Sequence, residues 1–264
     1  MEKNSQNKKK KVIAITRPFN RIDEAVKIIE ENNAEVFIAP TLELELVNSH
    51  SLKKLVEDLE KLDWLIFTSV SSLDSIFKFY PDFKEKLTDK TKIVAIGTKT
   101  KEKANEYGLV IDLVPKDFTA EGILKAMENF DIKDNLIGIP RTLSARHVLP
   151  HELKNRGAKI LIAESYKSVL PLDVVRIETL ITKIINNEID AITFTSPLTV
   201  KNLFKVVTDN QKDELIAKLS NYTLTVAIGP ITYKILDDLG ITAYYPDNYT
   251  VKDMLNLLFE NLVI

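Results

Sequence analysis

The chain has 264 residues, 45% of them hydrophobic and 28% charged, with a formal net charge of −2. This length favours two domains of about 130 residues each over a single one. The near-neutral charge argues against a nucleic-acid partner, and no segment approaches the roughly 20 apolar residues that a membrane helix needs. The absence of cysteine excludes disulfides and thiolate chemistry and is compatible with a reducing compartment.

The N-terminal segment, residues 1–10, is rich in Lys and Asn. The apolar run that follows it at Val12 is much shorter than the core of a signal peptide. We therefore expect a flexible, solvated tail and a cytoplasmic protein.

Short β-branched segments then alternate with amphipathic segments of helical length. The first are KVIAIT (11–16), a helix over 21–32 and AEVFIAP (34–40), followed by WLIFTS (64–69), a Phe-rich helix and KIVAIG (92–97). This alternation predicts parallel sheets with helices on both faces. Gly108, Gly157 and Gly240 each follow an amphipathic run, where a left-handed residue that ends a helix is expected.

Several of these segments occur twice. Residues 63–69 (DWLIFTS) recur as 190–196 (DAITFTS), and VAIG at 94–97 recurs at 226–229, in both cases with a Thr three residues further on. A weaker match pairs 13–17 (IAITR) with 137–141 (IGIPR). The chain therefore contains four segments: A1 (11–40), B1 (63–130), A2 (134–166) and B2 (190–262). Either pairing of an A with a B segment completes a five-stranded parallel sheet, so the pairing stays open at this point.

The repeated segments fall where strands turn into helices. In open α/β sheets, ligands bind at the carboxyl ends of strands, where the first N–H groups of each helix lack partners. Thr68, Ser69 and Ser196 place hydroxyls at expected N-cap positions, and Pro197 and Pro230 suit the first helical turn. Simple capping is the alternative for each residue alone, but together these helix starts predict a cleft for an anionic small molecule.

Arginine is scarce, and its placement supports an anionic ligand. Only six of the 36 basic residues are Arg, and four of those follow the first strands of the A segments: Arg17, Arg21, Arg141 and Arg146. Arginine binds carboxylates and phosphates through two parallel hydrogen bonds, which lysine cannot form. Surface salt bridges are the alternative for Arg21 and Arg146.

Other kinds of site have little support. The chain lacks both GxxxxGK[ST] and GxGxxG, so the standard nucleotide-binding loops are missing. His147 and His151 have the spacing of a metal pair, but Pro150 lies between them and no Cys supports the site, so we expect no metal. Thr119 and Thr250 precede apolar helices and are interpreted mainly as caps.

Tyr166 ends the return strand of segment A2, where the chain passes between domains. A phenol stays protonated at neutral pH and can donate a hydrogen bond or a proton to a leaving oxygen. Packing at the strand end, with the hydroxyl in water, is the alternative.

In their order and spacing these motifs resemble the uroporphyrinogen-III synthase family over nearly the whole chain after the tail. The resemblance rests on Thr16-Arg17-Pro18, Phe67-Thr68-Ser69, Ala95-Ile96-Gly97 with Thr100, Phe118-Thr119-Ala120-Glu121-Gly122, Arg141 and Arg146, Ser165-Tyr166, Phe194-Thr195-Ser196-Pro197, Ala227-Ile228-Gly229-Pro230 with Thr232, and Tyr249-Thr250. The chain departs from the family pattern at Val70, where Pro is common, and at Pro140-Arg141-Thr142, which leaves the role of Arg141 open.

The resemblance implies an α/β fold of two flavodoxin-like parallel-sheet domains joined by a two-stranded linker. It also implies crossed pairing, with a discontinuous first domain (11–38 and 170–264) and an inserted second domain (42–166). The implied activity needs no cofactor: in the interdomain cleft, hydroxymethylbilane loses water and is cyclised through a spiro-pyrrolenine that inverts ring D.

The resemblance further assigns roles to particular residues. Tyr166 matches the catalytic candidate, and the implied substrate-binding residues are Arg17, Thr68, Ser69, Thr100, Arg141, Arg146, Ser196, Pro197, Gly229 and Thr232. We expect a monomer that can receive the bilane from hydroxymethylbilane synthase, with neither a nucleic-acid nor a membrane partner. The alternative is a non-catalytic module of the same fold that binds an anionic ligand or has a regulatory role.

Overall fold

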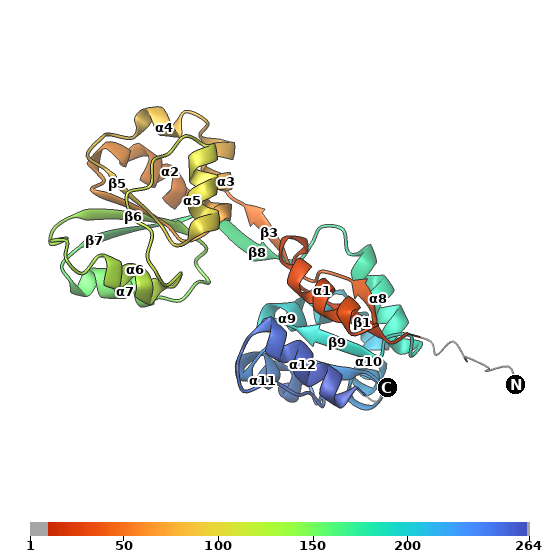
Figure 1. The fold of residues 1–264 in the computed structure, drawn as a ribbon. Coiled ribbons are helices and arrows are strands. Elements are labelled where there is room, and N and C mark those ends of the chain that lie inside the picture. Colours follow the sequence, from red (N-terminus) through yellow and green to blue (C-terminus); the bar gives the residue numbers. More distant parts are fainter. Residues whose placement is uncertain (1–9, 263–264) are drawn as a thin grey trace, which may run out of the picture. The chain divides into compact units, whose positions relative to one another are not determined.

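The chain divides into two compact units in a computed structural model that describes residues 10–262 (Figure 1). The terminal unit takes the chain up to Glu43 and from Val169 onward, and the inserted unit takes Leu44–Ser168. The tail predicted for residues 1–10 lies outside the described residues, apart from Lys10. Within residues 10–262, no helix is both long enough and apolar enough to cross a membrane.

The terminal unit contains a parallel sheet of four strands in the order β10-β9-β1-β2. Its strands are β1 (Val12–Ile15), β2 (Glu35–Ile38), β9 (Ala191–Phe194) and β10 (Leu224–Ala227). Its helices are η1 (Phe19–Arg21), α1 (Asp23–Glu31), α8 (Val175–Ile185), α9 (Pro197–Val206), α10 (Asp209–Asn221), α11 (Pro230–Asp238) and α12 (Val251–Asn261).

Alternating side chains of this sheet enter two separate apolar clusters. Ala14 packs with α8, α9, α10 and α11 on one face, whereas Ile13 and Ile15 pack with α1 and α12 on the other. All four residues of β9 are buried, which is typical of a central parallel strand covered on both faces. The sheet is therefore the middle of three layers, and its ends are the parts left open to a ligand.

The inserted unit repeats this architecture with a parallel sheet in the order β5-β4-β6-β7. Its strands are β4 (Trp64–Phe67), β5 (Lys92–Ala95), β6 (Leu136–Arg141) and β7 (Lys159–Glu164). Its helices are α2 (His50–Glu57), η2 (Leu59–Lys61), α3 (Val70–Phe79), α4 (Phe83–Lys86), α5 (Thr98–Glu106), α6 (Ala120–Ala126) and α7 (Val148–Asn155). Helices α2, α3 and α5 share one apolar cluster, and α6 and α7 share the cluster on the opposite face.

The crossed pairing is confirmed, because β1 pairs with β9, from the far end of the chain, with Ile13 opposite Ala191. The repeated aspartates hold the equivalent strands together in both units. The Asp190 carboxylate accepts the N–H of Val12 at 2.9 Å, and the Asp63 carboxylate accepts the N–H of Leu136 at 2.8 Å. The first residue of each DxxxFTS repeat is therefore structural.

The expected helix ends are confirmed as well. Gly108, Gly157 and Gly240 have φ values of 76°, 89° and 77°, and each follows a helix. This left-handed backbone costs little without a Cβ, which explains why glycine stands at these positions.

The prediction of five full strands per sheet is wrong, because the fifth position is reduced to a single bridge in each unit. Val94 bridges Leu113, and Val226 bridges Tyr244. Pro115 stands two residues after Leu113, and in the terminal unit a proline stands at the same distance after Tyr244. A proline has no N–H to continue the ladder, so pairing stops there.

The chain passes from one unit to the other through β3 (Glu43–Leu46) and returns through β8 (Tyr166–Val169). These strands pair with each other as the expected two-stranded sheet (Figure 1). Next to them, the N–H of Val47 donates to the carbonyl of Ser165 at 3.0 Å. The prediction that Tyr166 ends the return strand of segment A2 is wrong, because β7 ends at Glu164 and Tyr166 is the first residue of β8.

Candidate active site

In the terminal unit, the predicted binding residues gather at the carboxyl edge of the sheet. Arg17 follows β1, Ser196 follows β9 and Gly229 follows β10, and these strands are neighbours. Ser196 is the N-cap of α9: its hydroxyl accepts the N–H of Thr199 at 3.3 Å, in a reciprocal capping box. Pro197 occupies the first turn of α9, as predicted.

Arg17 differs from every other arginine in the described chain, because two of its guanidinium nitrogens, Nε and Nη1, are buried without a hydrogen-bond partner there. Burial lowers its pKa; nearby Glu24 opposes that shift and Arg21 adds to it. A buried donor without an acceptor is costly, and a carboxylate that accepted these N–H groups would remove that cost. Arg17 is therefore suited to hold an anionic group of a ligand.

The inserted unit presents an equivalent edge, formed by the ends of β5, β4 and β6. Ser69 is the N-cap of α3 and accepts the N–H of Ser71 at 3.1 Å, whereas Thr68 lies between the strand and this cap. Gly97 is the N-cap of α5, as Gly229 is of α11. The equivalent helix starts thus lie at equivalent strand ends in the two units.

Thr100 and Thr232 occupy the third position of α5 and α11, and their side chains are only 5% and 2% exposed. Their hydroxyls therefore have little surface to offer a ligand. Their backbone N–H groups belong to the first helical turn, where no acceptor is available within the helix. We therefore expect the backbone N–H groups of both threonines, and not their hydroxyls, to be available to a ligand, while their side chains pack inside the unit.

Arg141 and Arg146 have partners within the inserted unit. The buried side chain of Arg141 donates to the carbonyl of Thr142 at 3.2 Å and to the carbonyl of Arg146 at 2.8 Å. Arg146 forms two hydrogen bonds with the Glu121 carboxylate, at 3.0 and 3.2 Å. Arg141 thus shapes the 141–146 loop, and a substrate carboxylate would have to compete with Glu121 for Arg146.

Tyr166 is 7% exposed, and no described residue forms a hydrogen bond with its hydroxyl. It lies near Arg141: burial lowers the pKa of the Arg141 guanidinium, and the proximity of Tyr166 opposes that shift. The neighbouring Ser165 hydroxyl is buried and has no hydrogen-bond partner among residues 10–262. The surroundings of Tyr166 thus combine a cation with unused hydrogen-bonding groups.

The turn before the last helix of each B segment holds an exposed aromatic side chain, whose surface position was not predicted. Phe118 and Tyr249 are 54% and 59% exposed. A Cβ at Gly97 would lie 3.0 Å from the ring of Phe118, and one at Gly229 would lie 3.0 Å from the ring of Tyr249. The sequence holds a signal for this position, because Phe118-Thr119 and Tyr249-Thr250 both place an aromatic residue and a Thr directly before an apolar helix. Both threonines are caps, as predicted.

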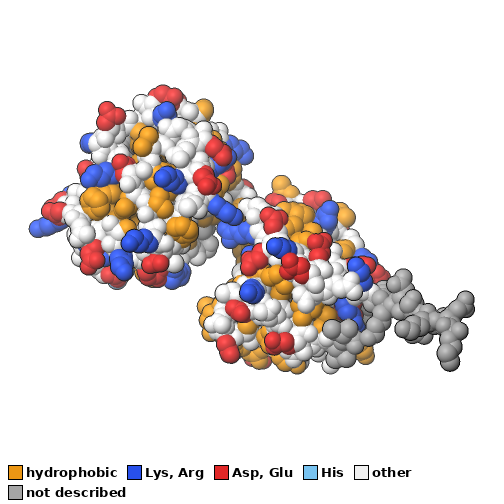
Figure 2. Space-filling model, in the orientation of Figure 1, with side chains coloured by type: hydrophobic (Ala, Val, Ile, Leu, Met, Phe, Trp, Pro, Cys, Tyr) orange, Lys and Arg blue, Asp and Glu red, His pale blue; other side chains and the backbone are white. Residues whose placement is uncertain are grey.

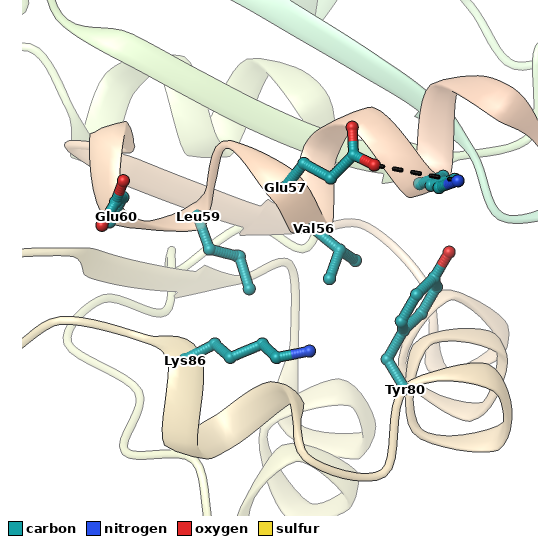
Figure 3. A pocket seen from close by; sticks show the side chains of 7 residues that line it. Val56, Glu57, Leu59, Glu60, Tyr80 and Lys86 are labelled. Atoms are coloured by element: carbon teal, nitrogen blue, oxygen red, sulfur yellow. Dashed lines mark ion pairs between the residues drawn. The ribbon is translucent and has the colours of Figure 1, made fainter.

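One hollow in the inserted unit lies away from these residues. It has a volume of about 500 Å³ and is lined by Lys53, Val56, Glu57, Leu59, Glu60, Tyr80 and Lys86 (Figure 3). It lies where α2 and α3 end, which is the amino end of the sheet. Its polar groups are largely paired, with Lys53 3.9 Å from Glu57 and the Tyr80 hydroxyl donating to Asn48 at 2.7 Å. No predicted site residue lines this hollow.

The surface carries no extended field of one charge on the visible face of either unit, where acidic and basic side chains are interspersed (Figure 2). Two parallel-sheet units, each with helix N-termini and arginine at its carboxyl edge, define a two-domain α/β protein of the flavodoxin-like class.

Comparison with known proteins identifies the family. The model of the family described as "Uroporphyrinogen-III synthase HemD" matches residues 23–256. A protein of Methanothermobacter thermautotrophicus that carries the name uroporphyrinogen-III synthase provisionally is 44% identical over 246 residues, covering 93% of this chain and 96% of that protein. A provisionally named counterpart from Methanocaldococcus jannaschii is 32% identical over 247 residues, covering 93% and 97%.

A solved structure agrees with the fold. The uroporphyrinogen-III synthetase of Helicobacter pylori matches with a TM-score of 0.60 at 15% identity, covering 95% of this chain and 99% of that one. The chain belongs to the uroporphyrinogen-III synthase family, which consists of lyases that act on a small tetrapyrrole in porphyrin biosynthesis.

Proposed function

We propose that this protein is a uroporphyrinogen-III synthase that cyclises hydroxymethylbilane. The carbon–oxygen bond of the terminal hydroxymethyl group breaks, and the hydroxyl leaves as water. The N–H proton of the same pyrrole ring is lost with that hydroxyl, which leaves an azafulvene. The substituted α-carbon of ring D attacks the methylene carbon of this azafulvene to form a spiro-pyrrolenine, which fragments and recombines with ring D inverted. The product is uroporphyrinogen III.

The observation that carries this proposal is the guanidinium of Arg17 at the strand edge of the terminal unit, whose Nε and Nη1 are buried without a hydrogen-bond partner among residues 10–262. A bilane bears an acetate and a propionate on each ring and so needs several anion sites. The helix starts at Ser69, Gly97, Ser196 and Gly229 supply further N–H groups of the kind that binds carboxylates. We propose that these N–H groups, together with Arg17, bind carboxylates of the bilane.

In this proposal Tyr166 donates a hydrogen bond to the departing hydroxyl group. Its phenol has no hydrogen-bond partner among the described residues, so the donor is free for a ligand. Arg141 is the positioning residue beside it, because its guanidinium lies near Tyr166 and is fixed by two backbone carbonyls. Thr68, Ser69, Thr100, Arg146, Ser196, Pro197, Gly229 and Thr232 complete the proposed binding set.

The proposed reaction depends more on how the protein orients the bilane than on acid or base catalysis. Either of the two α-carbons of ring D can attack the azafulvene. The enzyme must favour attack by the substituted one, which is an effect of orientation. We propose that the protein works as a monomer, without a cofactor, in the cytoplasm, and that it receives the bilane from hydroxymethylbilane synthase. Its domains in this proposal are 11–38 with 170–264, and 42–166.

The deciding experiment adds freshly made hydroxymethylbilane to the purified protein, oxidises the products and separates the uroporphyrin isomers. We expect type III to dominate with the protein and type I without it. Type I in both samples would contradict the synthase proposal. Tight binding of the bilane with type I as the product would favour the non-catalytic module of the same fold.

A further inference from the structure

We propose that Phe118 and Tyr249 each hold one pyrrole ring of the bilane by stacking against it. This inference rests on the proposed function and adds two substrate-binding residues to it, one in each unit. Neither ring is part of an apolar cluster, and more than half of each residue's surface is exposed.

The two rings are held by the same local structure. Each lies at the centre of a three-residue turn: the N–H of Thr119 donates to the carbonyl of Asp117 at 2.8 Å, and the N–H of Thr250 donates to the carbonyl of Asn248 at 2.9 Å. Each turn leads directly into a capped helix, α6 or α12. The aromatic side chain is therefore presented on a fixed backbone.

The distances along the chain also match. Phe118 stands five residues after the bridge at Leu113, and Tyr249 stands five residues after the bridge at Tyr244. Both bridges form with the outermost strand of a sheet, β5 or β10. Each aromatic residue therefore lies next to the glycine N-cap that follows this strand, Gly97 or Gly229. Each of the two sheets thus has an aromatic ring at the equivalent position of its carboxyl edge.

Glycine at two positions lets the ring approach the edge in the inserted unit. A Cβ at Gly97 would lie only 3.0 Å from the ring of Phe118. At Gly122, a Cβ would lie 1.9 Å from the carbonyl oxygen of Asp117, so the turn can close onto α6 only without a side chain. Close approach at these two glycines therefore determines the position of the Phe118 ring.

The chemistry next to each ring fits a carboxylated pyrrole. A pyrrole ring has an apolar face that stacks on an aromatic side chain, and its acetate and propionate extend from its rim. Beside Phe118, the first turn of α5 offers the backbone N–H groups of Thr98, Lys99 and Thr100, for which the helix itself has no acceptor. Beside Tyr249, the first turn of α11 offers those of Ile231 and Thr232.

The shared feature is the ring and not the hydroxyl, since Phe118 has no hydroxyl group. This difference makes the two sites a matched test. Tyr249→Phe keeps the ring, whereas Tyr249→Leu and Phe118→Leu remove it and keep an apolar side chain. Tyr222 is a control, because it is 67% exposed and lies between α10 and β10, at the amino end of the same sheet.

The experiment measures kcat, KM and the isomer ratio with freshly made hydroxymethylbilane, after circular dichroism has shown that each variant is folded. We expect Phe118→Leu and Tyr249→Leu each to raise KM about 2- to 10-fold, the range that corresponds to loss of one aromatic pair. The double variant should raise KM by about the product of the two factors. Tyr249→Phe should raise KM less than Tyr249→Leu does, and Tyr222→Leu should stay within about twofold of the wild type.

Different failures separate the two proposals. Type I product from the wild-type protein overturns the proposed function and, with it, the bilane as the ligand of these rings. Type III product from the wild type, with unchanged KM in both leucine variants, overturns only the stacking proposal. A Tyr249→Phe variant as impaired as Tyr249→Leu also overturns it, because the hydroxyl would then be the binding group.

Discussion

Arg17 provides the sharpest prediction, since its contributions to stability and to binding should have opposite signs. We expect Arg17→Met to weaken substrate binding without weakening the fold. In the free protein, Nε and Nη1 are buried without an acceptor among the described residues, and burial already lowers the pKa of the guanidinium. Methionine keeps much of the apolar stem and removes the unsatisfied donors.

The expected magnitudes follow from these contacts. An unsatisfied buried donor costs about 1–3 kcal/mol. Because Arg17 is only partly buried, we expect the free energy of unfolding to stay unchanged or to rise by about 1 kcal/mol at most. A hydrogen bond to a charged group contributes about 1.5–3 kcal/mol, so KM for hydroxymethylbilane should rise about 10- to 100-fold.

Two assays test this prediction. Urea unfolding gives the stability difference, and initial rates with fresh bilane give kcat and KM. Arg21→Met is the matched control, because Arg21 is exposed and lies four residues further on; its KM should change less than about twofold. A loss of more than about 1 kcal/mol in stability with an unchanged KM would show that Arg17 is structural and would refute the reasoning.

Three further predictions concern residues with distinct roles. Tyr166→Phe should lower kcat at least about tenfold, because a positioned proton or hydrogen-bond donor typically contributes more than that, while KM and unfolding stay nearly constant. Gly122→Ala should cost about 2 kcal/mol or more in urea unfolding, because its Cβ would meet a backbone carbonyl oxygen 1.9 Å away. Asp190→Ala should cost about 1–3 kcal/mol, because it removes the acceptor of the Val12 N–H at the start of the sheet.

Each of these changes has its own control. An unchanged kcat in Tyr166→Phe would remove the phenol from the mechanism and leave the family assignment intact. Gly240→Ala introduces strain at a φ of 77° but meets no atom within 4 Å, so it should cost less than Gly122→Ala. Asp190→Asn keeps an acceptor oxygen and should retain most of the stability; a loss equal to that of Asp190→Ala would assign the effect to the charge and its Lys11 partner.

The repeated strands and helix starts could be predicted from the sequence because their signals are local. Alternating apolar segments, Ser69 and Ser196 before helices, and glycine at the helix ends depend on residues a few positions apart. The backbone conformation of such capping residues is determined mainly by neighbouring residues in the sequence. The sequence by itself therefore determined the parallel α/β class, the duplication and the edge of the sheets where a site belongs.

The tertiary structure decided what depends on distant segments. The residues alone left the pairing of the A and B segments open, the family resemblance implied the crossed pairing, and the fold shows it in the pairing of β1 with β9. The fold also shows that pairing of the fifth strand stops after one bridge in each sheet. Arg17, Arg141 and Arg146 look alike in the sequence, but their surroundings differ. Nε and Nη1 of Arg17 have no hydrogen-bond partner in the described part of the chain, whereas Arg141 donates to backbone carbonyls and Arg146 is paired with Glu121. An arginine is free for a ligand only where no group from elsewhere in the chain neutralises it, and three-dimensional packing alone brings such groups together.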